Sequence, residues 1–239
     1  MKILVFDIWG EYAHFKKIYA TTSALSYVVP PKTSIYGYIG AILGLEKEGN
    51  IYLNSFQNKQ CLIGISVRSP IVMQRLGINL KAELGRKKEG DPPKPTMMEF
   101  VHRPHYRLYV HHSDKSIYEA LKLAVMEKRI VFTPTMGLAN LVSNFKFVGE
   151  FDAEKSIPTK TIEIHSVIPK KQFLAFDSSI FEDSEQNFSI VEQSMYALEM
   201  DTERNVTERD DILLERKCNP ILAQVKEYYA VNGENIILF

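Results

Sequence analysis

The chain has 239 residues, and its 29 lysine and arginine residues balance its 29 aspartate and glutamate residues. The length allows one large domain or two small ones, with enough chain to bury a core without disulfide or metal support. A hydrophobic content of 45% with 24% charged residues argues against intrinsic disorder. Zero net charge argues against a histone-like nucleic-acid binder, but a sum does not exclude a local basic face.

The charges are unevenly divided along the chain. Residues 1–111 hold 15 basic and 8 acidic residues, which gives +7, and residues 112–239 hold 14 and 21, which gives −7. This asymmetry suggests a basic half that binds a polyanion and an acidic half that faces elsewhere. The alternative is a fold that mixes both halves into one neutral surface.

The cysteines and the apolar segments bear on the compartment. Cys61 and Cys218 belong to no Cys-x-x-Cys pair, which excludes a disulfide framework or a zinc ribbon. Cys61 opens an apolar run and is expected to be a buried thiol in a strand. The apolar run before Asp7 is too short for a signal peptide, and the uncharged residues 35–45 are too few to span a bilayer. We expect a cytoplasmic protein with no membrane partner.

The chain opens with a strand pattern followed by a helix pattern. Residues 2–9 are β-rich and predict a first, central strand. A helix is expected over about 35–46, with Thr33 or Ser34 as its N-cap. This helix is rich in glycine, a poor helix former, which indicates close packing on a sheet or close approach of a backbone to a ligand.

The next elements complete a recognisable order. Residues 60–69 predict a second strand, and the basic residues 73–96 predict a long hairpin-like insertion. A strand over 97–112, a helix over about 115–128 capped by Asp114, and a strand over 146–151 follow. Strand, helix, strand, strand, helix, strand is the ferredoxin-like split βαβ order.

Short strand patterns then alternate with turns over residues 161–167, 172–176, 189–200 and 236–239. We therefore predict an α+β fold. It comprises a ferredoxin-like, RRM-like domain over residues 1–155, with its insertion at about 73–96, and a smaller β-rich part over 156–239.

The predicted first domain carries the residue types that bind single-stranded RNA. Aromatic rings stack on unpaired bases, and lysine and arginine neutralise phosphates. Ring and amine candidates lie close together in sequence: Tyr12, His14, Lys16, Lys17, Tyr19, Tyr27 and Tyr36. Hydroxyl candidates for phosphate and 2′-OH contacts are Thr21, Thr22, Ser23 and Ser26. Further candidate cations are Lys32, Arg75, Arg86 and Lys87. Trp9 and Phe15 are expected in the core.

Catalytic and metal chemistry has less support in the sequence. A metal-independent ribonuclease needs a general base and a general acid, for which Tyr109, His111 and His112 at a strand end are candidates. Adjacent strand residues point to opposite faces, so only one of the two histidines could serve. His102 and His105 lack a further ligand pair that would complete a metal site. We expect no metal and no cofactor.

Several motifs resemble one known family. The signature runs through residues 6–15, 21–33 and 37–44, and continues in residues 104–110, 133–137 and 196–204. It resembles that of the Cas-five family of CRISPR-associated proteins, in its type I-B-like branch, within the RAMP superfamily. The first 45 residues carry the most specific part of the resemblance.

The resemblance implies a subunit of the Cascade surveillance complex. Such a subunit grips the 5′ handle of the CRISPR RNA (crRNA) and caps the helical backbone of repeated subunits. It also contacts the large subunit, and it meets target DNA only through the complex. The insertion at 73–96 would be a thumb that wraps the RNA. The RNA-binding candidates then also include Thr33, Arg103, Met136 and Gly137.

In one related branch this subunit itself cuts precursor RNA with a Tyr, a Lys and a His. Here the corresponding strand end is His111-His112, so the Lys is missing. We therefore predict binding without catalysis. The alternative is a metal-independent endoribonuclease that processes repeat RNA. A third hypothesis is a pure assembly module whose acidic half docks protein.

Overall fold

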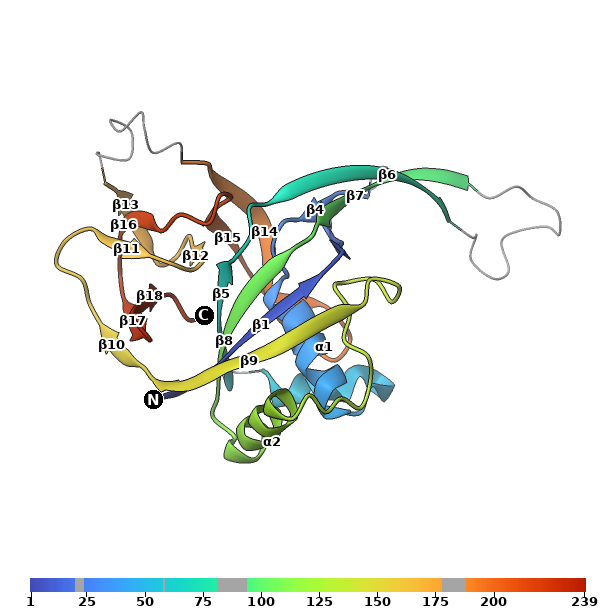
Figure 1. The fold of residues 1–239 in the computed structure, drawn as a ribbon, viewed down its shortest axis with the longest axis horizontal. Coiled ribbons are helices and arrows are strands. Elements are labelled where there is room, and N and C mark those ends of the chain that lie inside the picture. Colours follow the sequence, from blue (N-terminus) through green and yellow to red (C-terminus); the bar gives the residue numbers. More distant parts are fainter. Residues whose placement is uncertain (20–23, 58, 81–93, 178–187) are drawn as a thin grey trace.

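The computed structural model describes residues 1–19, 24–57, 59–80, 94–177 and 188–239. Its centre is a four-stranded antiparallel sheet in the order β5-β8-β1-β9 (Figure 1). The strands are β1 (Lys2–Gly10), β5 (Cys61–Val67), β8 (His105–His112) and β9 (Ser143–Asp152), and the helices are α1 (Lys32–Leu43) and α2 (Lys115–Met126). This order of elements and strands is the ferredoxin-like arrangement, which confirms the predicted α+β fold.

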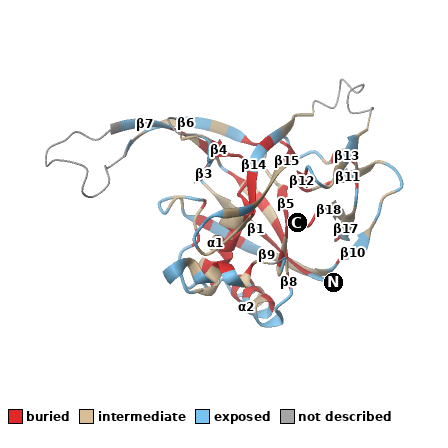
Figure 2. Cartoon of the chain, turned by 180° about the vertical axis from the view of Figure 1, so that it is seen from behind, coloured by how far each residue is buried: buried red, intermediate tan, exposed pale blue. Residues whose placement is uncertain are grey.

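Strand β1 is buried on both faces along its first half. Leu4, Phe6 and Ile8 pack on the side of α1 and α2. Ile3 and Val5 point to the other side, where they join a second cluster with residues of the C-terminal part. Successive strand residues face opposite ways, so an uninterrupted apolar run is what such a doubly covered strand requires. Figure 2 shows the buried residues gathered where the helices meet the sheet.

The helix ends follow the sequence only in part. The predicted cap at Thr33 or Ser34 is wrong, because α1 begins at Lys32 after Pro31, whose extended backbone precedes the first turn without any side-chain cap. The helix ends at Gly44, which has a φ of 70°. Helix α2 begins as predicted, and the Asp114 carboxylate accepts a hydrogen bond from the Ser116 amide at 2.8 Å.

The insertion is an antiparallel hairpin that projects from the body of the molecule (Figure 1). Its arms are β6 (Val72–Leu80) and β7 (Lys94–His102), and residues 81–93, with Arg86 and Lys87, lie outside the described residues. The single strand expected over 97–112 is two strands, β7 and β8. The chain breaks between them at Arg103, with a φ of 48°, and Pro104.

The segments between β1 and β5 attach to this framework. The short strand β2 (Tyr12–Ala13) pairs with β7, and β3 (Phe15–Lys16) pairs with β4 (Ser26–Tyr27). A 3₁₀ segment, η1 (Glu48–Ser55), follows α1. Cys61 is fully buried in β5, as predicted, and burial raises the pKa of its thiol to about 12.

The C-terminal part is built of strands, as predicted, but with more of them. They are β10 (Glu154–Ser156), β11 (Ile162–Ile164), β12 (Ile168–Pro169), β13 (Phe173–Phe176), β14 (Ile190–Met200), β15 (Val206–Glu215), β16 (Ile221–Val225), β17 (Tyr228–Val231) and β18 (Glu234–Ile236). The sequence did not predict β15, because its first half is charged and carries no strand pattern. The segment is a strand because its backbone pairs with β14. The boundary at residue 155 stays a prediction.

The C-terminal part closes one edge of the central sheet. The Ile63 amide donates to the Phe239 carbonyl at 3.0 Å, and the Phe239 amide donates back at 3.1 Å. The Val167 amide donates to Ile65 at 2.8 Å. Gly64 allows this approach, since a Cβ there would lie 3.0 Å from the Ile237 carbonyl oxygen. Within the described residues, no helix is both long enough and apolar enough to cross a membrane.

We predict that Gly64→Ala lowers the free energy of unfolding by about 1–3 kcal/mol, because the added methyl overpacks this seam. Gly77→Ala in β6 is the matched control, since a Cβ there would meet only the Met97 sulfur at 3.6 Å. Urea denaturation of both variants measures the difference. Equal effects would show that the seam tolerates a side chain.

Candidate nucleic-acid interface

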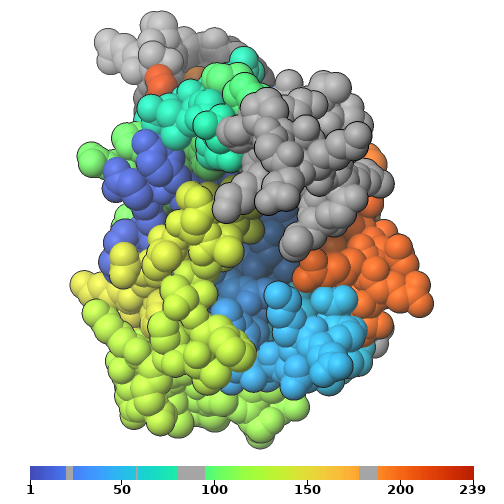
Figure 3. Space-filling model, turned by 90° about the vertical axis from the view of Figure 1, so that its right-hand side faces the viewer, coloured from blue at the N-terminus to red at the C-terminus, as the bar shows by residue number. Residues whose placement is uncertain are grey.

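A groove of about 710 Å³ lies on the helix side of the molecule. Figure 3 shows it as a hollow with α1 at its base, between the loop over residues 132–137 and the turn that follows β14. Segment η1 contributes a further wall through Tyr52. Among the described residues that line the groove, none is acidic. The hollow is therefore suited to a negatively charged occupant.

The floor of the groove is the small-residue face of α1. Gly37, Gly40 and Ala41 line it, so the helix backbone is accessible there. A Cβ at Gly40 would lie 3.4 Å from the Tyr52 ring, and one at Gly37 would meet only the Tyr52 hydroxyl at 3.9 Å. A side chain at Gly40 would meet the η1 ring of Tyr52 in an ordinary contact, and Gly37 leaves the floor open. The approach of a ligand backbone to these glycines stays a prediction.

The first turn of α1 opens into the same groove. Thr33 and Ser34 line it and are half-buried. The turn has no side-chain cap and no acidic residue. Backbone N–H groups at a helix N-terminus, together with the helix dipole, favour an anion such as a phosphate. The two hydroxyls add donors at the same place.

The loop over residues 132–137 is fixed at both ends. The amides of Val131 and Phe132 donate to carbonyls of α1 at 3.1 and 2.9 Å, and the His14 amide donates to the Met136 carbonyl at 3.0 Å. Gly137 has a φ of 98°, and a Cβ there would overlap the His14 carbonyl oxygen, so the position requires glycine. The Phe132 side chain is left 57% exposed at the rim of the groove, where a base can stack.

Two cations complete the groove, Lys47 and Arg204. Arg204 lies in the turn after β14, and its Nε donates to Asn50 Oδ1 at 3.0 Å. The Asn50 amide nitrogen donates to the Thr202 carbonyl at 3.0 Å. These bonds hold the turn against η1, so the two walls keep a fixed separation.

A buried ion pair joins the floor of the groove to β14. Lys32 Nζ lies 3.0 Å from Glu199 Oε1, with side chains only 3% and 12% exposed. The Tyr36 hydroxyl donates to the same carboxylate oxygen at 3.0 Å. Burial, and then the charge of Glu199, raise the pKa of Tyr36, so it stays a neutral donor. Lys32 and Tyr36 therefore build the groove from beneath and do not line it.

Several predicted RNA-binding residues are in the core. The buried ones are His14, Ser26, Tyr27, Lys32, Tyr36 and Met136. Each polar group among them has an internal partner; for example, the Tyr27 hydroxyl donates to the Met195 carbonyl at 2.8 Å, and His14 Nδ1 lies 2.7 Å from the Glu99 carbonyl oxygen. In this structure these side chains do not reach a ligand on the surface, because the described residues between 12 and 36 pack against β7 and β14.

The remaining predicted residues are dispersed. Only Thr33 and Gly137 line the groove. Those at other surfaces, exposed or half-buried, are Tyr12, Lys16, Lys17, Tyr19, Arg75 and Arg103. Thr21, Thr22 and Ser23 lie outside the described residues, as do Arg86 and Lys87. Trp9, expected in the core, is only half-buried, whereas Phe15 is in the core.

The lining residues that the sequence did not single out for this purpose include Ser34, Lys47, Tyr52, Phe132 and Arg204. Arg204 lies in the segment 196–204 that resembles a family motif. The glycines of α1 indicated that a ligand could approach the helix backbone. Nothing in the local pattern marks Phe132 or Lys47.

The candidate catalytic residues have structural partners. His112 is buried, and the Asp114 amide donates to its Nδ1 at 3.0 Å, so its Nε2 carries the proton and donates to the Ser55 carbonyl at 2.7 Å. His111 points the other way, with Nδ1 2.9 Å from the Lys2 carbonyl oxygen. The Tyr109 hydroxyl is hydrogen-bonded to Glu234. The described residues hold no cluster of three or more His, Cys, Asp or Glu that could bind a metal ion.

Comparisons with known proteins agree with this fold. The pattern of a family described as CRISPR-associated protein (Cas_Cas5) matches residues 3–115. The chain is similar to the crystal structure of a CRISPR protein from Archaeoglobus fulgidus, with 13% identity, 99% of this chain and 98% of that chain covered, and a TM-score of 0.57. It is also similar to a chain in the cryo-EM structure of the type III-B Cmr-beta bound to cognate target RNA and AMPPnP, with 14% identity, 94% and 86% coverage and a TM-score of 0.52. No curated protein sequence matches the chain.

We predict that Lys32→Met lowers the free energy of unfolding by about 3–5 kcal/mol, because Glu199 is left buried and uncompensated. Lys32→Met with Glu199→Leu should recover most of the loss. The control is Lys170→Met at the pair with Glu192, whose side chains are 48% and 39% exposed. An exposed pair contributes about 1 kcal/mol or less. Chemical denaturation measures all three, and equal losses for the two single variants would contradict the assignment.

Proposed function

We propose that this chain, which belongs to the Cas-five family of CRISPR-associated proteins through residues 3–115, binds the 5′ handle of crRNA as a non-catalytic subunit of a type I Cascade surveillance complex. One observation carries the proposal: the described residues that line the groove include no acidic one, but do include the first turn of α1, two cations and the exposed Phe132 ring. Cations that follow the backbone and rings that stack on bases are the groups that bind single-stranded RNA.

The groups of the groove divide the work of binding. A phosphate of the handle sits at the first turn of α1, where Thr33 and Ser34 donate hydrogen bonds. Lys47 and Arg204 neutralise further phosphates from the opposite wall. Phe132 offers its ring to an unpaired base. Gly37 lets the RNA backbone come close, since this position presents no side chain.

The partners follow from the same proposal. A subunit that holds the handle caps the backbone of repeated subunits, contacts the large subunit, and meets target DNA only through the complex. The proposed system is type I-B-like, and the proposed compartment is the cytoplasm. The similar Cmr-beta structure is described as bound to cognate target RNA, which supports a nucleic-acid partner for this fold. The hairpin of β6 and β7 projects from the body of the molecule (Figure 1), which supports its role as the thumb.

The endoribonuclease alternative predicts specific cleavage of repeat RNA in EDTA that His112→Ala abolishes. Both ring nitrogens of His112 are engaged within the protein. We therefore expect the chain to leave the repeat RNA intact under these conditions. Specific cleavage lost in the His112→Ala variant, with its fold retained, would favour the enzyme.

We predict that Lys47→Gln with Arg204→Gln weakens binding of a labelled handle RNA and flattens its salt dependence. Two lost phosphate contacts on a single strand reduce the slope of log K against log salt by about 1.4. Fluorescence anisotropy at several salt concentrations gives the slope. Lys128→Gln with Lys160→Gln is the matched control, since both lysines are exposed and neither lines the groove. The same slope in both double variants would exclude the groove as the RNA site.

A further inference from the structure

The face of the central sheet that is turned away from the helices is only half covered. Ile3 and Val5 of β1 and Tyr109 of β8 are buried there against the C-terminal part. Further along the same strands, Trp9 and His105 occupy the same face, and both are half-buried. Neither belongs to a core cluster of the described residues. The described residues of the C-terminal part thus do not bury this end of the sheet.

Trp9 and His105 form a pair on the two central strands. They lie directly opposite each other in the register of β1 and β8. Their ring centroids are 5.9 Å apart, with an interplanar angle of 63°. In an RRM, aromatic side chains on the sheet stack two or three unpaired bases. The sheet order β5-β8-β1-β9 places this pair at the centre of the open face.

We infer that the open end of this sheet face is a second binding site, for single-stranded nucleic acid, centred on Trp9 and His105. It lies on the opposite side of the sheet from the groove at α1. It therefore does not depend on the function proposed for the groove.

The charged side chains next to the Trp9–His105 pair include one fixed ion pair and one exposed lysine. Arg107 Nε and Nη2 donate to the two carboxylate oxygens of Asp7 at 2.7 and 3.1 Å. That contact raises the pKa of the Arg107 guanidinium and fixes it beside the rings. Lys146 of β9 pairs in register with Asp7 on the other side, and it is exposed.

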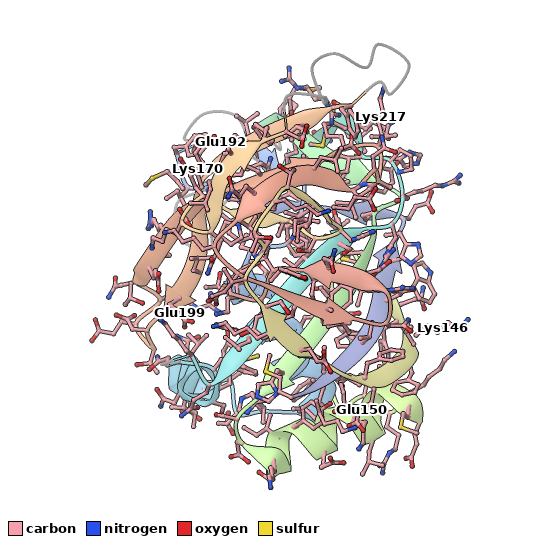
Figure 4. The ribbon with its side chains drawn as sticks, turned by 90° about the vertical axis from the view of Figure 1, so that its left-hand side faces the viewer. Lys146, Glu150, Lys170, Glu192, Glu199 and Lys217 are labelled. Carbon is pink, nitrogen blue, oxygen red and sulfur yellow. The ribbon has the colours of Figure 1, made fainter. Side chains whose placement is uncertain are left out.

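Lys146 is the cation left for a phosphate. Among the described residues it has no ion-pair partner within 4.0 Å, whereas Arg107 is already neutralised by Asp7. Figure 4 shows Lys146 at the edge of the sheet, on the side of the molecule away from Glu192 and Glu199. We therefore expect stacking to supply most of the affinity, with one phosphate contact and a salt slope of about −0.7.

The composition of the face favours a nucleic acid over a protein partner. The core of a protein interface is depleted in charged residues. Here the row next to the two rings in the register of the sheet is charged throughout, with Asp7, Arg107 and Lys146. A base needs only a ring of matching size and hydrogen-bonding groups at its edge.

The chain contains a single tryptophan, Trp9, so its selectively excited tryptophan fluorescence reports on this site. The test titrates the full chain with a 12-nucleotide oligouridine RNA, or with an oligothymidine DNA of the same length. We expect saturable quenching as a base stacks on Trp9. Equal midpoints for the two probes would indicate recognition by stacking, and a preference for RNA would indicate contact with the 2′-OH. No quenching by either probe would overturn the inference and leave the face to a protein partner.

Variants locate the site. His105→Ala should raise the RNA concentration at the quenching midpoint about 5-fold or more. Lys146→Gln should reduce the slope of log K against log salt by about 0.7. Lys146 is exposed, so this variant tests the site without disturbing the fold. The groove variant Lys47→Gln with Arg204→Gln should leave the midpoint unchanged. Loss of quenching in that groove variant would show that there is one site and not two.

Discussion

The ion pair between Lys32 and Glu199 is the interaction on which the candidate groove depends. Its two residues are far apart in sequence, and each would be strongly disfavoured in the interior alone. Together with the Tyr36 hydroxyl they fix the first turn of α1 against β14. The floor and one wall of the groove therefore have a defined separation before any ligand arrives. Pre-organisation of this kind lowers the entropy lost on binding.

Much of the framework could be predicted because its signals are local. The apolar run of β1, the Asp114 cap of α2 and the basic insertion are each carried by one continuous segment of the sequence, and each lies near its expected place. Strand β15 is different: its first half is charged and becomes a strand through pairing with β14. The N-cap of α1 also differed from the prediction. Pro31 supplies the extended backbone conformation before the first turn that a Thr or Ser cap would otherwise provide.

The candidate site could be predicted less well, because burial of a tyrosine is a tertiary property. Tyr27 and Tyr36 look like Tyr12 and Tyr19 in sequence, yet the first two are buried with hydroxyl partners on β14. The division of charge along the chain also failed to predict one cation of the groove. Arg204, a cation of the groove, comes from the acidic half. The fold thus mixes the two halves at the very place where a polyanion is proposed to bind.

The pairing of β5 with residue 239 has a consequence for synthesis in the cell. Ile63 finds its partner Phe239 only after the intervening chain has left the ribosome. At about 5–20 residues per second, that interval lasts on the order of 10–35 s. During it, the edge strand of the first domain exposes unpaired backbone groups, which is the usual template for aggregation. Yield and solubility should therefore depend on the rate of translation and on chaperones that shield this edge.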